Sequence, residues 1–138
     1  MSGAVTRGQV LRFLVVGGCG FAVDVLVFQW LIQLDGGLIL SRLISASAAI
    51  TVTWVMNRVF TFKSANTPSP GSEYLRYISV QGVGLVLNLG CYFLLVLRVE
   101  YFAVNPLLAL CAGAGLAIVS NFLGSKFWVF RADEHSAR

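Results

Sequence analysis

The sequence FLVVGGCGFAVDVLVFQWLIQL, residues 13–34, is an apolar run of 22 residues with a single charge, Asp24. A bilayer core about 30 Å thick requires about 20 apolar residues of α-helix, so this run is long enough to cross it. Three further runs pass the same test: residues 36–57, with one charge at Arg42, and residues 77–97 and 101–125, with none. The sequence therefore predicts an all-α membrane protein with four transmembrane helices.

The composition agrees with a membrane location. Of the 138 residues, 57% are apolar and 12% are charged, and the mean hydropathy is +0.81. A water-soluble domain carries roughly a quarter charged residues, so we expect residues 1–138 to form one transmembrane domain. The net charge of +4 would suit nucleic acid, but the basic residues lie at the ends of the apolar runs, where they act as topology signals. No nucleic-acid partner is expected.

Charge placement predicts the orientation of the spans. Residues 63–73, KSANTPSPGSE, have the Pro, Gly and Ser content of a solvated loop. When this loop and both termini are placed on one side, eight of the ten basic residues fall there, so that side is predicted to be cytoplasmic. The eight are Arg7, Arg12, Arg58, Lys63, Arg76, Lys126, Arg131 and Arg138, whereas Arg42 and Arg98 fall on the other side.

The two halves of the sequence are similar to each other. A shift of 64 positions aligns the first span with the third, and a shift of 68 aligns the second with the fourth. Because each half has two spans, both have the same orientation, which predicts two helical hairpins in a parallel repeat. The aligned pairs include Arg12 and Arg76, Gly20 and Gly84, Asp24 and Asn88, Ser45 and Gly113, Thr53 and Asn121, and Arg58 and Lys126.

Small residues recur every four positions from Ser41 to Thr53 and from Ala109 to Asn121. This spacing lets helix backbones approach closely in a bilayer, where hydrophobicity does not drive helices together. We expect the second and fourth helices to pack through these two faces, and packing alone explains them.

Asp24 lies within the first span. A carboxylate near the bilayer centre costs about 2.5–3.5 kcal/mol on insertion scales, so it usually has a partner or a task. Arg42 is a candidate partner, although it lies nearer the outer boundary and is also able to snorkel. Two interpretations stay open: Asp24 serves a polar cavity, or it makes a structural hydrogen bond between helices. For Asn88, at the aligned position in the third span, a structural hydrogen bond between helices is the favoured interpretation.

Basic and aromatic residues gather where the second and fourth spans end, in NRVFTFK at residues 57–63 and SKFWVFR at residues 125–131. Aromatic belts and basic anchors are sufficient to produce this pattern. The alternative is that the basic side chains bind the phosphate of a lipid-linked substrate. Arginine can form two parallel N–H···O bonds to phosphate oxygens, like a fork, whereas lysine provides a single compact charge. The candidate phosphate-binding residues are Arg58, Lys126, Arg12 and Arg76.

The residue patterns of common enzymes are missing from the sequence. His135 is alone in a polar tail, the three cysteines lack metal-ligand spacing, and there is no P-loop or nucleophile elbow. We therefore expect transport, binding or anchoring, with no catalytic residues, no metal and no cofactor.

Several motifs together resemble those of the GtrA-like family. They are RFLVVGG at residues 12–18, Asp24, NRVFTF at 57–62, NF at 121–122 and KFWVF at 126–130. The similarity extends over residues 12–131, nearly the whole chain. One departure is Ser125 at the position aligned with Asn57, so the two halves are not equivalent if the amide contacts substrate.

This resemblance implies a small multi-pass protein of the bacterial inner membrane that serves cell-surface polysaccharide or lipopolysaccharide modification. The role proposed for the family is to flip a polyprenyl-phosphate-linked monosaccharide from the cytoplasmic to the periplasmic leaflet, between membrane glycosyltransferases that make and use it. Other members are proposed to anchor partner proteins.

Residues and resemblance together suggest a path for such a lipid. The phosphate docks on the four basic residues at the cytoplasmic side, and Arg42 receives it near the outer leaflet. The polar path for the sugar is expected to be lined by Asp24, Asn57, Asn88, Thr53 and Asn121.

Two other functions stay open on the sequence. A small proton-coupled multidrug exporter also has four short spans and an acid in its first helix, although the strong charge bias argues against its dual-topology form. A membrane anchor for a glycosyltransferase would use the basic residues only for topology. Four helices enclose a narrow space, which is compatible with a homodimer that builds the path between two protomers.

Overall fold

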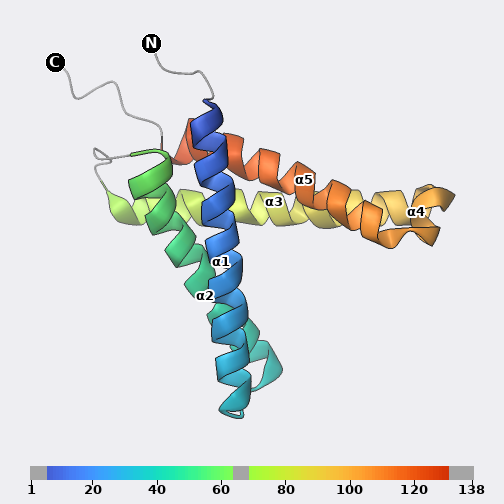
Figure 1. Ribbon diagram of the computed structural model, residues 1–138, viewed down its shortest axis with the longest axis horizontal. Helices are drawn as coiled ribbons and strands as arrows, with labels where there is room; N and C mark the ends of the chain where they lie inside the picture. Colours follow the sequence, from blue (N-terminus) through green and yellow to red (C-terminus); the bar gives the residue numbers. More distant parts are fainter. Residues whose placement is uncertain (1–5, 64–68, 131–138) are drawn as a thin grey trace. The chain divides into compact units, whose positions relative to one another are not determined.

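The computed structural model describes residues 6–63 and 69–130, and every regular element in these ranges is a helix. Within them, four segments are long and apolar enough to cross a membrane, which confirms the predicted all-α fold with four spans (Figure 1). The elements are α1 (Arg7–Gln33), α2 (Leu38–Met56), η1 (Asn57–Thr61), α3 (Pro70–Arg98), α4 (Glu100–Val104), α5 (Pro106–Gly124) and η2 (Ser125–Val129).

The helices form two compact units that match the two halves of the repeat. The first unit is a hairpin in which α1 packs along α2 and η1, and the second is a hairpin in which α3 packs along α5 and η2. In Figure 1 each pair of long helices lies side by side, blue with green and yellow with orange.

Two helix boundaries differ from the predicted spans. The fourth span was expected to begin at Tyr101, but α4 ends at Val104 and α5 begins at Pro106. The residue before a proline is disfavoured in the α conformation, and Asn105 accordingly has φ −122° and ψ 64°. In addition, α3 begins at Pro70, inside the predicted loop 63–73, because proline fits the first turn of a helix, where no N–H is needed.

Close contacts at glycines hold each hairpin together. Gly20 of α1 lies directly against Thr53 of α2, and the aligned Gly84 of α3 lies against Asn121 of α5. A third glycine, Gly113 of α5, lies against the backbone and side chain of Asn88 in α3. All the buried residues of α2 and two of the three in α5 belong to the predicted small-residue faces, which confirms packing through them: Ser41, Ser45 and Thr53 in α2, and Ala109 and Gly113 in α5. The third buried residue of α5 is Phe122.

Gly113→Ala is expected to destabilise the second hairpin by about 1–3 kcal/mol, the usual cost of overpacking. A Cβ at this position would lie 2.6 Å from the backbone oxygen of Asn88, which is not free to move aside as a side chain is. Gly115→Ala is the matched control because nothing lies within 4 Å of its Cβ position. The free energy of unfolding in mixed detergent micelles measures both variants, and equal values would contradict the packing described.

Candidate basic site at the hairpin ends

The second long helix of each hairpin ends in a π-helical turn, at Asn57–Thr61 and at Ser125–Val129. Phe62 N donates to the Asn57 carbonyl at 2.9 Å, and Phe130 N donates to the Ser125 carbonyl at 2.8 Å. The turns are related by the 68-residue shift of the repeat. π-turns occur at the C-terminal ends of helices, and these two carry Arg58 and Lys126.

Aromatic contacts fix these turns on the first helix of each hairpin. The rings of Phe13 and Phe62 lie 6.2 Å apart between centroids, and the aligned Tyr77 and Phe130 lie 6.0 Å apart. Since Phe13 and Tyr77 each follow an arginine in the sequence, the contacts bring basic residues of the two helices to one end of each hairpin. The predicted phosphate-binding residues thus lie at the same end of their own hairpin: Arg12 and Arg58 in the first unit, and Arg76 and Lys126 in the second.

Local contacts position three of these cations. Nη1 of Arg12 donates to the Phe60 carbonyl at 3.2 Å. The guanidinium carbon of Arg58 lies 5.7 Å from the ring centroid of Trp54, and Nζ of Lys126 lies 5.7 Å from that of Phe127. A cation within about 6 Å of a ring centroid is attracted by the ring quadrupole. The end of each hairpin therefore combines basic and aromatic groups, as the interface of a bilayer favours.

The fifth predicted phosphate-binding residue, Arg42, makes an ion pair with Asp24. Nη1 of Arg42 lies 2.7 Å from Oδ2 of Asp24, whose side chain is 15% exposed. Asp24 is nine residues before the end of α1, and Arg42 is four residues after the start of α2. Counted from the turn that joins the two helices, Asp24 lies five residues deeper in the hairpin than Arg42. This difference is about 7.5 Å along the helix axis at 1.5 Å per residue. Arg42 therefore reaches toward the middle of the hairpin instead of snorkelling outward. The aligned residues of the second unit, Asn88 and Leu110, carry no charge.

The other polar residues expected along a path lie within the hairpins. The Thr53 hydroxyl donates to the carbonyls of Ala49 and Ile50, and Asn57 is 1% exposed. Oδ1 of Asn88 and of Asn121 is buried and accepts no hydrogen bond from the described residues. Three of these residues, Thr53, Asn88 and Asn121, thus lie in the contact between the two helices of their own unit.

Sequence reasoning missed two buried polar residues near the basic ends. Glu73 was placed in the solvated loop 63–73, but it lies in the first turn of α3 and is 1% exposed. A carboxylate in the first turn is favoured by the helix dipole, and Pro70 three residues earlier was the available signal for a helix start. Ser125, at the start of η2, is fully buried, and no sequence pattern predicted its burial.

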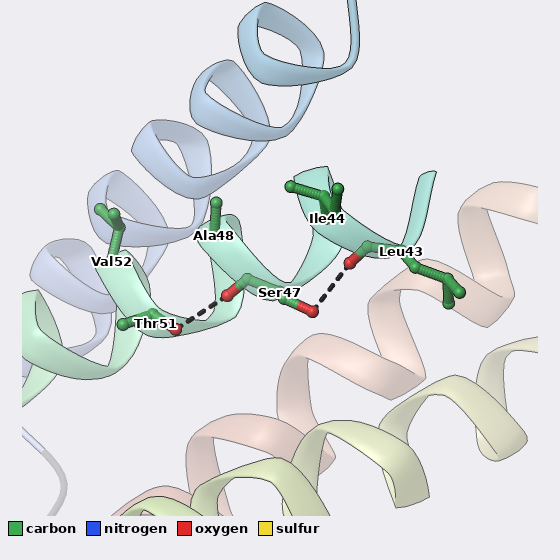
Figure 2. Close-up of a pocket in the computed structure, with 6 residues that line it drawn as sticks. All are labelled: Leu43, Ile44, Ser47, Ala48, Thr51 and Val52. Atoms are coloured by element: carbon green, nitrogen blue, oxygen red, sulfur yellow. Dashed lines mark hydrogen bonds between the residues drawn. The ribbon is translucent and has the colours of Figure 1, made fainter. Parts of the chain in front are cut away.

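Two grooves lie on the first unit. The larger, about 540 Å³, runs along α2, where the hydroxyls of Ser47 and Thr51 donate to the carbonyls of Leu43 and Ser47 (Figure 2). Its lining carries no charge. The smaller, about 350 Å³, includes one cation, Arg12. The larger groove is lined by Leu43, Ile44, Ser47, Ala48, Thr51 and Val52, and the smaller by Leu11, Arg12, Val15, Val16, Met56 and Phe60.

These features define a small helical membrane protein made of two repeated hairpins, each with a basic, π-helical end. The family model described as GtrA/DPMS, transmembrane domain, matches residues 12–130. The chain therefore belongs to the GtrA/DPMS transmembrane-domain family, and the resemblance seen in its motifs is confirmed. A search of curated proteins finds no match to the chain.

Proposed function

We propose that the protein translocates a polyprenyl-phosphate-linked monosaccharide from the cytoplasmic to the periplasmic leaflet of the bacterial inner membrane. The observation that carries this proposal is the pair of basic residues at the π-helical end of each hairpin. Membership of the GtrA/DPMS family supports the substrate class. The monosaccharide would serve cell-surface polysaccharide or lipopolysaccharide modification, and membrane glycosyltransferases would supply and use it.

The arginines are suited to a phosphodiester. A guanidinium has five N–H donors, and the hydrogen bond of Arg12 to the Phe60 carbonyl uses one of its nitrogens. Hydrogen bonds to charged groups contribute about 1.5–3 kcal/mol each. In the first unit, Arg12 and Arg58 would each offer a fork to a phosphate, whereas in the second unit Lys126 would offer a point charge. The protein binds and moves the lipid in this proposal and breaks no bond.

The ion pair of the first hairpin would serve the far end of the path. Asp24 is twelve residues beyond Arg12 in the same helix, or about 18 Å along its axis. Arg42 would receive the phosphate there while Asp24 holds its guanidinium in place. The polyprenyl tail would stay in lipid, and a homodimer would give the sugar more room than one chain does.

The membrane potential would drive the transfer. Such a lipid carries one negative charge, and moving one charge across the membrane is worth about 2.3 kcal/mol per 100 mV. Because the cytoplasm is negative, outward movement of an anion is favourable, so no coupled ion is needed.

The ion pair of Asp24 argues against the proton-coupled exporter. Such an exporter needs its membrane carboxylate available for a proton or a cationic drug, whereas Oδ2 of Asp24 is 2.7 Å from Arg42. The anchor alternative makes a different prediction, because a protein that only recruits a glycosyltransferase has no effect on lipid movement.

A reconstitution experiment tests the proposal. Purified protein is placed in liposomes that contain labelled polyprenyl-phosphate glucose, and the exposure of the inner-leaflet pool to an impermeant reagent is followed. We expect exposure much faster than in protein-free liposomes, and unchanged movement of labelled phosphatidylglycerol. If the labelled lipid becomes accessible no faster than in protein-free liposomes, whichever of several sugars it carries, translocation is rejected and the anchor function is favoured.

A further inference from the structure

The smaller groove of the first unit combines an apolar lining with a single cation. It has a volume of about 350 Å³ and lies between α1 and the end of α2 with η1. Five of its six lining side chains are apolar, and the sixth is Arg12. Three of the apolar ones are more than half exposed: Leu11 at 64%, Val15 at 58% and Phe60 at 57%. This combination suits an amphiphile with an anionic head and a hydrocarbon chain.

Arg12 is fixed at the groove by the backbone of η1. Its Nη1 donates to the carbonyl of Phe60, and the Phe60 side chain itself lines the groove. The last carbonyls of a helix lack partners within the helix, so this hydrogen bond satisfies one of them and orients the guanidinium. The remaining N–H groups of Arg12 are the donors that a phosphate at the groove would need.

The second unit is built differently at the aligned positions. Met56 of the groove corresponds to Gly124, and Val16 corresponds to Val80. A Cβ on Gly124 would lie 2.8 Å from Cγ1 of Val80, so Val80 packs directly on the backbone of α5. At the place where the Met56 side chain borders the groove in the first unit, the second unit has a glycine with Val80 against it.

A second difference removes apolar surface from the aligned region. Val15 corresponds to Ser79, whose hydroxyl donates to the Leu75 carbonyl at 2.9 Å. A hydroxyl in place of the valine methyls makes this surface less favourable for hydrocarbon. Arg76 still supplies a cation at the position of Arg12, so the second unit keeps the charge and offers less apolar side chain, with Ser79 and Gly124 in place of Val15 and Met56.

We propose that the groove of the first unit binds the isoprene units nearest the phosphate of the polyprenyl chain, with the phosphate on Arg12. Ligand pockets range from about 300 to 1,000 Å³, so a groove at the lower end holds a section of chain and not the whole lipid. The aligned surface of the second unit does not hold the chain. This assignment rests on the proposed function for its substrate and gives the two hairpins different roles.

Photolabelling in the bilayer tests the assignment. Full-length protein is reconstituted with a polyprenyl phosphate that carries a diazirine in its first isoprene units, and labelled residues are mapped by mass spectrometry. We expect labelling at residues 11–16 and 56–60, with little at the aligned residues 75–80 and 124–128. Excess polyprenyl phosphate should compete, and phosphatidylglycerol should not. Equal labelling of both units, or equal competition by phosphatidylglycerol, would overturn the assignment.

Matched variants separate groove binding from general lipid contact. Val15→Trp fills the groove from an exposed position and should reduce labelling severalfold, whereas Ser79→Trp at the aligned position should leave it unchanged. Arg12→Gln keeps a donor for the Phe60 carbonyl but removes the charge, and losing a charge-assisted hydrogen bond should lower labelling about tenfold. Equal effects of the two tryptophan variants, or full labelling of Arg12→Gln, would contradict the proposal.

The two proposals fail in different ways. Labelling confined to the first groove, without lipid translocation in the same liposomes, would keep the chain-binding assignment and reject translocation. Translocation with labelling spread evenly over both hairpins would keep the function and reject the assignment.

Discussion

Arg58→Ala is expected to slow lipid translocation about tenfold to a hundredfold, while the protein still inserts and folds. A charge-assisted hydrogen bond to phosphate contributes about 1.5–3 kcal/mol, and each 1.4 kcal/mol is about a factor of ten. Arg58 is positioned for this role in the π-helical turn, with its guanidinium 5.7 Å from the Trp54 ring centroid. Lys126→Ala should have the same direction and a smaller effect, since lysine cannot form the fork.

Arg7→Ala is the matched control for this prediction. Arg7 is an exposed arginine at the start of α1, on the same predicted side of the membrane, so its removal changes the charge bias equally. The exposure rate of labelled lipid is compared for the three variants at equal protein per liposome. Wild-type translocation by a well-inserted Arg58→Ala protein would remove Arg58 from the site.

Asp24→Ala is expected to lower the free energy of unfolding by about 1–3 kcal/mol, within the range of couplings between contacting residues. The variant leaves the Arg42 guanidinium, whose side chain is 60% exposed on an apolar span, without its carboxylate. A charge that has lost its partner in hydrocarbon costs more than the loss of both partners. The double variant Asp24→Ala/Arg42→Ala should therefore regain part of the stability. Unfolding in mixed detergent micelles measures the cycle, and strictly additive effects would contradict the ion pair.

Measuring lipid translocation by the same variants distinguishes an ion pair that only stabilises the fold from one in which Arg42 also binds the phosphate. If Arg42 receives the phosphate, the double variant regains stability but stays slow in lipid exposure. Recovery of both properties would assign Asp24 and Arg42 to folding alone.

The sequence was sufficient for the architecture because each span is a long apolar run and hydrocarbon leaves few alternatives to a helix. The alignment of two halves by shifts of 64 and 68 also anticipated the pairs Gly20 with Gly84 and Thr53 with Asn121, which make equivalent contacts in the structure. Pro106 indicates the boundary between α4 and α5, but the apolar run of residues 101–125 continues across this proline and suggested one unbroken helix.

The details of the basic ends were less predictable. No residue preference marks a π-turn, so η1 and η2 had no signature in the sequence beyond their aligned motifs. The burial of Glu73 depends on its place in the first turn of α3, which the polar composition of residues 63–73 obscured. The groove of the first unit depends on Met56 and Phe60 lying beside α1, and such a relation between two helices cannot be read from any single apolar run.

The most direct test of the central claim is the equilibrium distribution of labelled polyprenyl-phosphate glucose between leaflets under a set potential. A potential of 100 mV, negative inside the liposomes, shifts the equilibrium of a lipid with one negative charge by about 2.3 kcal/mol, or about fifty-fold. We predict that proteoliposomes reach an outer-leaflet excess of this size and that it disappears when the potential is collapsed. A distribution that stays as it was prepared, as in protein-free liposomes, would contradict translocation of a lipid-linked phosphate by this protein.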